Sequence, residues 1–387
     1  MNQVCRPTGP AMPQPSDNRS ELVRTYKIWQ GSNIFALHGR LIFGPDARSL
    51  LLSFLMIVPP VGVFCTFVAR KLMDDFPHHW GVSIMVFAIA LTVCNVIFLL
   101  LTSARDPGIV PRKNHPPESE DLGSRRGRTE EVEVNGMRVQ VKYCETCMHY
   151  RPPRCSHCSI CDNCVERFDH HCPWVGQCIG ARNYRFYFLF VSSATALCIY
   201  VFAFCWVYVV RIMHGEETTI WKALIKTPAS IALIIYCFLL MWFVGGLTVF
   251  HSYLISRNQT TYENFRALYD HRANPYNKGV LGNFKEVFFS PIPPSKNKFR
   301  AKVQKELDFP SRRVNGSVVN PITGRANMDM EMGMKPSQIE WELDRPMGEL
   351  GDIKEGSERG SLDGFEKQIN DADVMEEPGV EPGVQSR

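Results

Sequence analysis

The sequence predicts an all-α membrane protein that has four transmembrane helices and a small cytosolic cysteine-rich domain containing β-hairpins. Two observations carry this prediction. Apolar residues make up only 45% of the 387 residues, but they are gathered into four long blocks without charge. Eight of the 14 cysteines fall in one loop, between Cys144 and Cys178. The first pattern is typical of membrane spans, and the second of a small domain held together by its cysteines.

Each apolar block has the length of a transmembrane helix. The blocks contain no Asp, Glu, Lys or Arg and have 19 to 25 residues, whereas about 20 helical residues are enough to cross the hydrocarbon layer. Buried helices of a soluble core usually keep a polar stripe, which these blocks lack. Pro59 and Pro60 predict a kink in the first block. The predicted spans are 50–68, 81–101, 186–210 and 230–250.

The distribution of positive charge predicts the orientation of these spans. The loop 102–185 carries 13 Lys and Arg residues, whereas the loops 69–80 and 211–229 carry two and three. Lysine and arginine close to the membrane ends mark the cytosolic side. We therefore expect the loop 102–185 and both termini in the cytosol.

The remaining segments flank the spans. Residues 1–49 are expected to form a cytosolic N-terminal segment, and the basic juxtamembrane region 251–313 suits contact with anionic lipid headgroups. Residues 314–387 are rich in Gly, Pro, Asp and Glu, which predicts a disordered acidic tail. From Ala326 onward, 16 acidic and 6 basic residues give a charge of −10 and leave +14 for the rest of the chain. We expect membrane lipids, and not nucleic acid, as partners of this basic body.

Two local signals organise the loop 102–185. Asp106-Pro107-Gly108 predicts a turn directly after the second span. From Val132 to Val141, alternating apolar residues flank Asn135-Gly136, a strong signal for a β-hairpin with a type I′ turn. Because this hairpin leads straight into the cysteines, we expect the cysteine-rich domain over about residues 130–182.

The cysteines and histidines of this domain have the spacing of zinc ligands. Thiolates and imidazoles separated by two residues suit tetrahedral zinc, and a cytosolic location disfavours disulfides. Eight ligands make two closed sites, but spacing alone leaves open which residues bind. The candidates are Cys144, Cys147, His149, Cys155, His157, Cys158, Cys161, Cys164, His170, His171, Cys172 and Cys178.

The string Asp169-His170-His171-Cys172-Pro173-Trp174, followed by Cys178-Ile179-Gly180, closely resembles the cysteine-rich domain of the DHHC protein S-acyltransferases. The turn at Asp106 resembles the DPG motif of that family, and Thr260-Thr261-Tyr262-Glu263 resembles its TTxE motif. The stretch from Asn274 to Asn283 is similar to the family's C-terminal element, although less closely. The resemblance covers roughly residues 50–289.

The resemblance implies a division of the ligands between two structural zinc ions. It leaves Cys155 and His149 outside both sites. One departure is visible, because Gly176-Gln177 precedes Cys178 where many members carry Asn, but the ligand itself is kept. The implied sets are Cys144, Cys147, His157 and Cys164 for the first ion, and Cys158, Cys161, His171 and Cys178 for the second.

The resemblance also implies that Cys172 is a nucleophile. A thiol is largely protonated at neutral pH, so it needs a base, and a carboxylate can orient that base. His170 is expected to be the base and Asp169 the orienting carboxylate. The expected activity moves a palmitoyl group from acyl-CoA to protein cysteines in two ping-pong steps through acyl-Cys172.

The acyl chain is expected to lie between the spans because hydrocarbon prefers the membrane interior. Candidate cavity residues in the third span are Phe186, Phe190, Leu197 and Tyr200. Arg182 and Arg185 are candidates for binding the phosphates of CoA. The alternative reading of these arginines is that they anchor the third span at the interface.

Two alternatives compete with this reading. A membrane-tethered zinc-binding adaptor would explain the spans and the ligands but would leave Asp169, His170 and Cys172 without a role. A transporter would be expected to carry charged groups or broken helices within the spans, and the spans contain no charge. The substrates are expected to be cytosolic or membrane-associated proteins, and the plasma membrane is the first choice of compartment, with Golgi and endoplasmic reticulum as alternatives.

Overall fold

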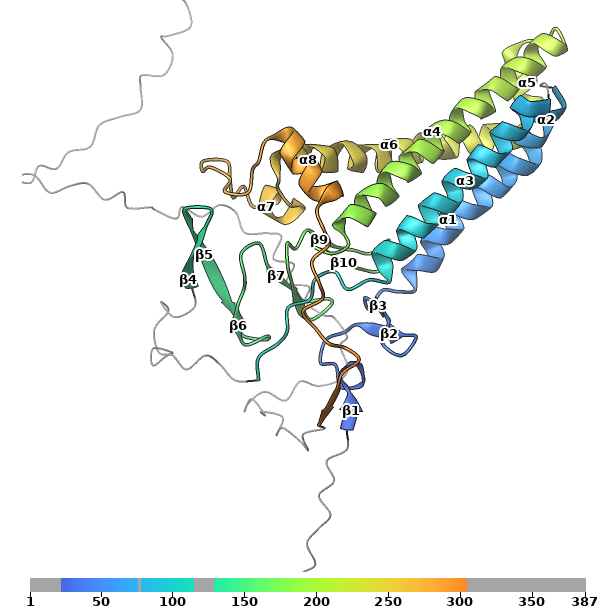
Figure 1. Ribbon diagram of the computed structural model, residues 1–387. Coiled ribbons are helices and arrows are strands. Elements are labelled where there is room, and N and C mark those ends of the chain that lie inside the picture. The colour runs from blue at the N-terminus through green and yellow to red at the C-terminus, as the bar shows by residue number, and fades with distance from the viewer. Residues whose placement is uncertain (1–21, 76–77, 115–128, 305–387) are drawn as a thin grey trace, which may run out of the picture. The chain divides into compact units, whose positions relative to one another are not determined.

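A computed structural model describes residues 22–75, 78–114 and 129–304 (Figure 1). Four helices in it are long and apolar enough to cross a membrane, namely Ser49–Asp75, Trp80–Ser103, Tyr184–Gly215 and Pro228–Arg257. The prediction of four spans is therefore confirmed, and the chain is a multi-pass membrane protein. The predicted disordered tail, 314–387, lies outside the described residues.

The first span is built from three joined helical pieces. The helix α1, Ser49–Phe64, contains Pro59 and Pro60 and continues through a π-helical turn, Cys65–Ala69, into α2, Arg70–Asp75. The other spans are single helices: α3, His78–Ser103; α4, Tyr184–Gly215; and α6, Pro228–Arg257. A short helix, α5, Ile220–Lys226, connects α4 to α6.

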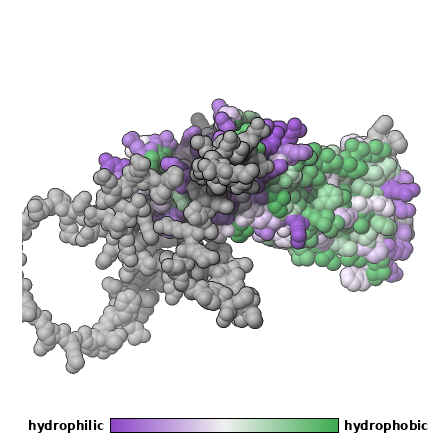
Figure 2. All heavy atoms as spheres, turned by 90° about the horizontal axis from the view of Figure 1, so that it is seen from below, coloured by the Kyte–Doolittle hydropathy of each residue, from purple (hydrophilic) through white to green (hydrophobic). Residues whose placement is uncertain are grey.

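The spans pack around α4, and polar side chains join them. Asn95 of α3 donates 2.8 Å hydrogen bonds to the Phe190 carbonyl and the Ser193 hydroxyl of α4. Tyr200 of α4 donates to the Ile84 carbonyl at 2.9 Å. Such bonds hold membrane helices together where the hydrophobic effect cannot. The outward faces carry exposed apolar side chains, and Figure 2 shows them gathered over the helical part of the molecule, where lipid would cover them.

The cysteine-rich domain consists of three small antiparallel sheets. The hairpin of β4, Thr129–Val134, and β5, Met137–Cys144, turns at Asn135 and Gly136, both of which have positive φ. A type I′ turn requires this backbone conformation, so the predicted hairpin is confirmed. The strand β6, His149–Tyr150, pairs with β5, and the other two sheets pair β7, Ser156–Cys158, with β8, Asn163–Val165, and β9, His170–Cys172, with β10, Gln177–Ile179.

The segments before the first span and after the last span meet each other. The strand β1, Leu22–Arg24, pairs with β11, Lys302–Gln304, and a 3₁₀ turn, Thr25–Lys27, follows it. A second hairpin joins β2, Ile34–Ala36, to β3, Leu41–Phe43. Next to these strands, the rings of Trp29 and Phe35 lie 5.0 and 5.4 Å from the ring of Phe299. Two further helices, α7, Thr261–Phe265, and α8, Val280–Phe289, follow α6.

Candidate functional site

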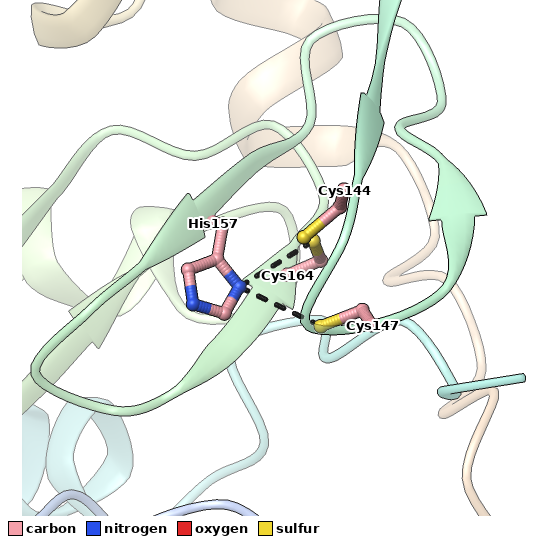
Figure 3. Close-up of side chains that lie close together, drawn as sticks. All are labelled: Cys144, Cys147, His157 and Cys164. Atoms are coloured by element: carbon pink, nitrogen blue, oxygen red, sulfur yellow. Dashed lines mark hydrogen bonds between the residues drawn. The ribbon is translucent and has the colours of Figure 1, made fainter. Parts of the chain in front are cut away.

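Two groups of side chains in the cysteine-rich domain are arranged to hold metal ions. Within each group, one ligand atom from every residue lies within 4.8 Å of all the others. In the first group, His157 Nδ1 lies 3.5 Å from Cys147 Sγ and 3.8 Å from Cys164 Sγ (Figure 3). In the second, His171 Nδ1 lies 3.3 to 3.8 Å from three sulfurs. The groups are Cys144, Cys147, His157 and Cys164, and Cys158, Cys161, His171 and Cys178.

Strand pairing explains how neighbours in the sequence serve different groups. His157 lies opposite Cys164 in the β7–β8 pair, and His171 lies opposite Cys178 in the β9–β10 pair. Side chains of consecutive strand residues point to opposite faces, so Cys158 turns away from the group that His157 joins. These pairings bring together the same two sets of residues that the family resemblance implied.

The donor chemistry of both groups fits zinc. Each offers three cysteine sulfurs and one histidine nitrogen, the set that closed tetrahedral zinc sites use. The second ring nitrogen of each histidine faces a carboxylate: His171 Nε2 lies 3.0 Å from Asp46 Oδ2, and His157 Nε2 lies 3.5 Å from Asp162 Oδ1. Such carboxylates orient metal-binding imidazoles. Sequence reasoning missed both aspartates, because neither belongs to a recognisable spacing.

The turn between β9 and β10 depends on a glycine. Gly176 has a φ of +75°, and its amide donates to the Cys172 carbonyl at 2.8 Å. A Cβ atom at this position would lie 2.6 Å from the Asp46 carbonyl oxygen, closer than real Cβ atoms come. The glycine thus allows residues 46–47 to pack on the turn that follows Cys172.

Alternation along β9 also places His170 and Cys172 on the face opposite His171. His170 Nδ1 lies 2.6 Å from Asp169 Oδ2. Asp169 is only 1% exposed, and it accepts two more hydrogen bonds from Thr261, one from the amide at 2.9 Å and one from the hydroxyl at 2.7 Å. The His170 ring packs edge-on against the Tyr187 ring, 5.2 Å between centroids.

The electrostatics of this pair favour a charged carboxylate and a basic imidazole. Burial raises the pKa of Asp169, but the hydrogen bond and charge of His170 outweigh burial and lower that pKa to about 2. Burial lowers the pKa of His170, whereas the hydrogen bond with Asp169 and the neighbouring Cys172 thiol raise it to about 9. The arrangement can therefore take up a proton beside Cys172 and stabilise the resulting imidazolium.

Cys172 also borders an apolar cavity of about 260 Å³ between the spans. All four spans contribute to its wall. Of the four residues expected to line an acyl cavity, Phe190 and Leu197 do so, and Phe186 and Tyr200 are not among the lining residues. Phe186 instead packs under the guanidinium of Arg105, 4.6 Å from the ring centroid. Other lining residues include Ser53, Met56, Val61, Asn95, Trp174, Tyr187, Val201, Tyr236, Cys237 and Leu240.

A buried ion pair attaches the cysteine-rich domain to the segment after α6. Arg154 donates to both carboxylate oxygens of Glu263 at 2.7 Å and to Asn258 Oδ1 at 2.9 Å. Glu263 Oε2 also accepts from the Thr260 amide, and the Thr260 hydroxyl accepts from the Glu263 amide, so the two residues form a capping box for α7. This cap aims the neighbouring Thr261 at Asp169.

The Asp106 turn attaches the other side of the domain. Asp106 Oδ1 accepts from the amides of Gly108 and Ile109 at 2.9 Å, and Oδ2 lies 2.9 Å from Arg182 Nη1. Arg182 Nε donates to the Pro293 carbonyl, and Arg185 Nε donates to the Val287 carbonyl. Both arginines therefore bind the segment around residues 287–293 that follows the last span. The contact of these arginines with CoA stays a prediction.

His149 and Cys155 lie beside the first metal group without belonging to it. His149 is buried, and its Nδ1 lies 2.8 Å from the Tyr150 carbonyl oxygen. Cys155 is partly buried against the first metal group. Neither residue is a member of the two groups that could hold a metal ion.

The fold and the site define a multi-pass membrane protein with a zinc-binding cysteine-rich domain whose Asp-His-Cys arrangement opens onto an apolar cavity. Residues 138–267 match the model of the DHHC palmitoyltransferase family. The chain is 61% identical to "Probable protein S-acyltransferase 7" of Arabidopsis thaliana, over 89% of this chain and 80% of that protein. It is 58% identical to "Probable protein S-acyltransferase 6" of the same organism, over 90% of this chain and 86% of that protein. The chain belongs to the DHHC family of protein S-acyltransferases, and the resemblance stated from its motifs is confirmed.

Proposed function

We propose that this acyltransferase moves a palmitoyl group from acyl-CoA to cysteine thiols of proteins through an acyl-Cys172 intermediate. One observation carries the proposal. Cys172 borders the apolar cavity of the spans and shares the strand β9 with His170, whose ring contacts Asp169. A thiol next to a base and an apolar cavity between the spans is suited to thioester exchange with a fatty acyl donor.

In the first step, His170 accepts the thiol proton of Cys172, and the resulting thiolate attacks the thioester carbonyl of acyl-CoA. A bond forms between Cys172 Sγ and the acyl carbon, the bond between that carbon and the CoA sulfur breaks, and CoA leaves with the proton. In the second step, a substrate cysteine loses its proton to His170 and attacks the acyl-Cys172 thioester. A bond forms between the substrate sulfur and the acyl carbon, the bond between that carbon and Cys172 Sγ breaks, and Cys172 takes the proton back from His170. One thioester replaces another in each step, so no further energy source is required.

Asp169 acts through His170. Its 2.6 Å contact with Nδ1 fixes the ring so that Nε2 is left for the thiol proton, and its charge stabilises the imidazolium. Thr261 in turn fixes the carboxylate through two hydrogen bonds. The TTxE-like segment thereby supports the base from outside the cysteine-rich domain.

The cavity would hold the acyl chain during both steps. Burying a methylene group stabilises by about 0.8 kcal/mol, so a 16-carbon chain gains far more than a short one. The lining residues reach from Cys172 to Val201 and Cys237, deep in the bundle. The side chains that close this end would set the longest chain that the enzyme accepts.

Two zinc ions, held by the two cysteine and histidine groups, would cross-link the cysteine-rich domain and fix the position of Cys172 between them. Four protein ligands fill each tetrahedral site, so the role is structural. The loop with Cys172 and both termini would face the cytosol, because most of the basic residues lie on that side. This orientation gives Cys172 access to cytosolic acyl-CoA and to cytosolic or membrane-associated substrates, with the plasma membrane as the proposed compartment.

Release of CoA by the purified protein tests the proposal. We expect palmitoyl-CoA to be consumed by the wild type and by Cys155→Ser, which removes a nearby thiol outside both metal groups. We expect no consumption by Cys172→Ser, with two zinc ions still bound per chain. Zinc binding without CoA release in the wild type would instead support a membrane-tethered adaptor.

A further inference from the structure

A second cavity, of about 630 Å³, lies where α3 ends and the cysteine-rich domain begins. Its wall comes from the β2–β3 hairpin at residues 39–42, the last turn of α3 with the residues after it, the segment 295–301, and the side chain of Arg182. It shares no lining residue with the cavity that Cys172 borders. The proposed acyl site therefore does not account for it.

The charge of this cavity is strongly positive. Five cationic side chains line it, and Asp106 is the one acidic residue among the lining residues. Both carboxylate oxygens of Asp106 are already engaged, by Arg182, by Ser295 and by two backbone amides. The five cations are Arg40, Arg105, Arg182, Lys298 and Arg300.

Four of these cations have no acidic partner within the described ranges 22–75, 78–114 and 129–304. The fifth, Arg182, forms an ion pair with Asp106. Arg105 is half-buried and lies over the Phe186 ring. Burial and the nearby charge of Arg182 lower the pKa of Arg105. An anion bound here would relieve that repulsion.

The position of the cavity identifies the class of anion. Leu100 and Leu101, from the last turn of α3, line it beside the cations, and Leu100 is 50% exposed. The apolar span ends at Ser103, so the cavity opens at the boundary between hydrocarbon and water. A site that combines cations with an exposed leucine at the end of a span matches a ligand with a charged head and apolar tails. A soluble phosphate would have no use for the leucines.

We propose that this cavity binds the phosphate headgroup of an anionic phospholipid, with Arg105, Lys298 and Arg300 as its main contacts. Arginine forks match phosphate oxygens, and cytosolic leaflets are rich in anionic lipids. The proposal rests on the proposed cytosolic orientation of the cysteine-rich domain, but not on acyl transfer.

A bound headgroup would also tie distant parts of the chain together. The side-chain amide of Gln177 donates to the carbonyls of Ser103 and Arg105 at 2.7 and 2.8 Å. Gln177 precedes Cys178, a member of the second metal group, so the end of α3 that lines the cavity is joined to that group. The hairpin and the segment 295–301 line the same cavity, and a shared anion would hold them against the end of α3.

Titration of the purified full-length protein with dioctanoyl phosphatidic acid, followed by native mass spectrometry, tests this site. The cavity variant is Arg105→Gln/Lys298→Gln/Arg300→Gln. A matched control removes the same charge from exposed residues elsewhere, as Arg138→Gln/Lys222→Gln/Lys285→Gln. A rescue variant, Arg105→Lys/Arg300→Lys, keeps the charge. Dioctanoyl phosphatidylcholine and glycerol 3-phosphate serve as the neutral-lipid and tail-free probes.

We expect saturable binding of one phosphatidic acid molecule per wild-type chain. A surface cation contributes roughly fivefold to such binding, so the cavity variant should bind at least about tenfold more weakly. The affinity of the control and rescue variants for phosphatidic acid should stay within about threefold of the wild-type affinity. Two zinc ions per chain in the cavity variant would show that it is folded.

Equal affinities of the cavity and control variants would overturn the proposal. So would glycerol 3-phosphate binding as tightly as the lipid, because the site would then serve a soluble phosphate. Release of CoA by the same preparations tests the acyl-transfer proposal separately.

Discussion

Replacing Glu263 with Gln should loosen the attachment of the cysteine-rich domain to the segment after the last span. Glu263 and Arg154 are 4% and 7% exposed at their side chains and are 2.7 Å apart. Burial lowers the pKa of Arg154, but the charge of Glu263 outweighs it and raises that pKa, so the arginine is charged. The variant therefore leaves a buried guanidinium without its counter-charge.

The magnitude follows from what glutamine keeps and what it removes. Losing one partner of a buried ion pair costs about 3–5 kcal/mol. Glutamine can still cap α7, and Arg154 still donates to Asn258, so the cost should lie near the lower end, about 3 kcal/mol. At about 2–4 °C per kcal/mol, the midpoint of thermal unfolding should fall by about 6–12 °C.

Thermal unfolding of the purified protein in detergent measures this effect. The control is Glu131→Gln, which removes the charge from the exposed pair Arg138–Glu131, 3.8 Å apart with side chains 85% and 56% exposed. An exposed pair of this kind contributes less than about 1 kcal/mol. The double variant Arg154→Met/Glu263→Met should lose less stability than the sum of the losses in Arg154→Met and Glu263→Met, because no unpaired charge remains in it.

Equal midpoints for Glu263→Gln and Glu131→Gln would refute this reasoning. They would mean that water or another acceptor compensates Arg154, and that the ion pair does not hold the two regions together. A double variant as unstable as the sum of its single variants would lead to the same conclusion.

Three further predictions concern the site itself. Thr261→Val removes a 2.7 Å hydrogen bond to the charged Asp169, and a charged hydrogen bond contributes about 1.5–3 kcal/mol, so the rate of CoA release should fall at least tenfold while zinc content is unchanged. Val201→Phe fills the cavity, and losing room for two methylene groups should lower the preference for a 16-carbon over a 12-carbon donor about tenfold in competition assays. Removal of metal by a chelator should make the six cysteines of the two metal groups reactive toward a thiol reagent and unfold the domain, as followed by near-ultraviolet circular dichroism; unreactive thiols after complete zinc loss would contradict the structural role.

The spans and the hairpin could be predicted from the sequence because their signals are local. Charge-free blocks of about 20 residues identify the helices, and Asn135-Gly136 between alternating residues identifies the turn. The two sets of metal ligands could not be predicted from local signals. Twelve cysteines and histidines have similar spacing, and only the family resemblance assigned eight of them, because pairing across β7–β8 and β9–β10 decides which side chains meet.

Contacts between distant residues could not be predicted. Asp46 meets His171 from 125 positions away, and Arg154 meets Glu263 from 109 positions away. Nothing in their own neighbourhoods marks them, and the pairing of β1 with β11 is equally non-local. The charge of Arg182 and Arg185 predicts contact with CoA, which stays a prediction, but it does not reveal their partners: Arg182 contacts Asp106 and the Pro293 carbonyl, and Arg185 donates to the Val287 carbonyl.

Locating the acyl group after a single turnover tests the central claim most directly. The purified wild type would be mixed briefly with alkyne-labelled palmitoyl-CoA, digested, and analysed by mass spectrometry with and without hydroxylamine. We predict one hydroxylamine-sensitive acyl group on the peptide that contains Cys172, and none on Cys172→Ser. Equal labelling of that variant, or a label that maps to another cysteine of the wild type, would contradict an acyl-Cys172 intermediate.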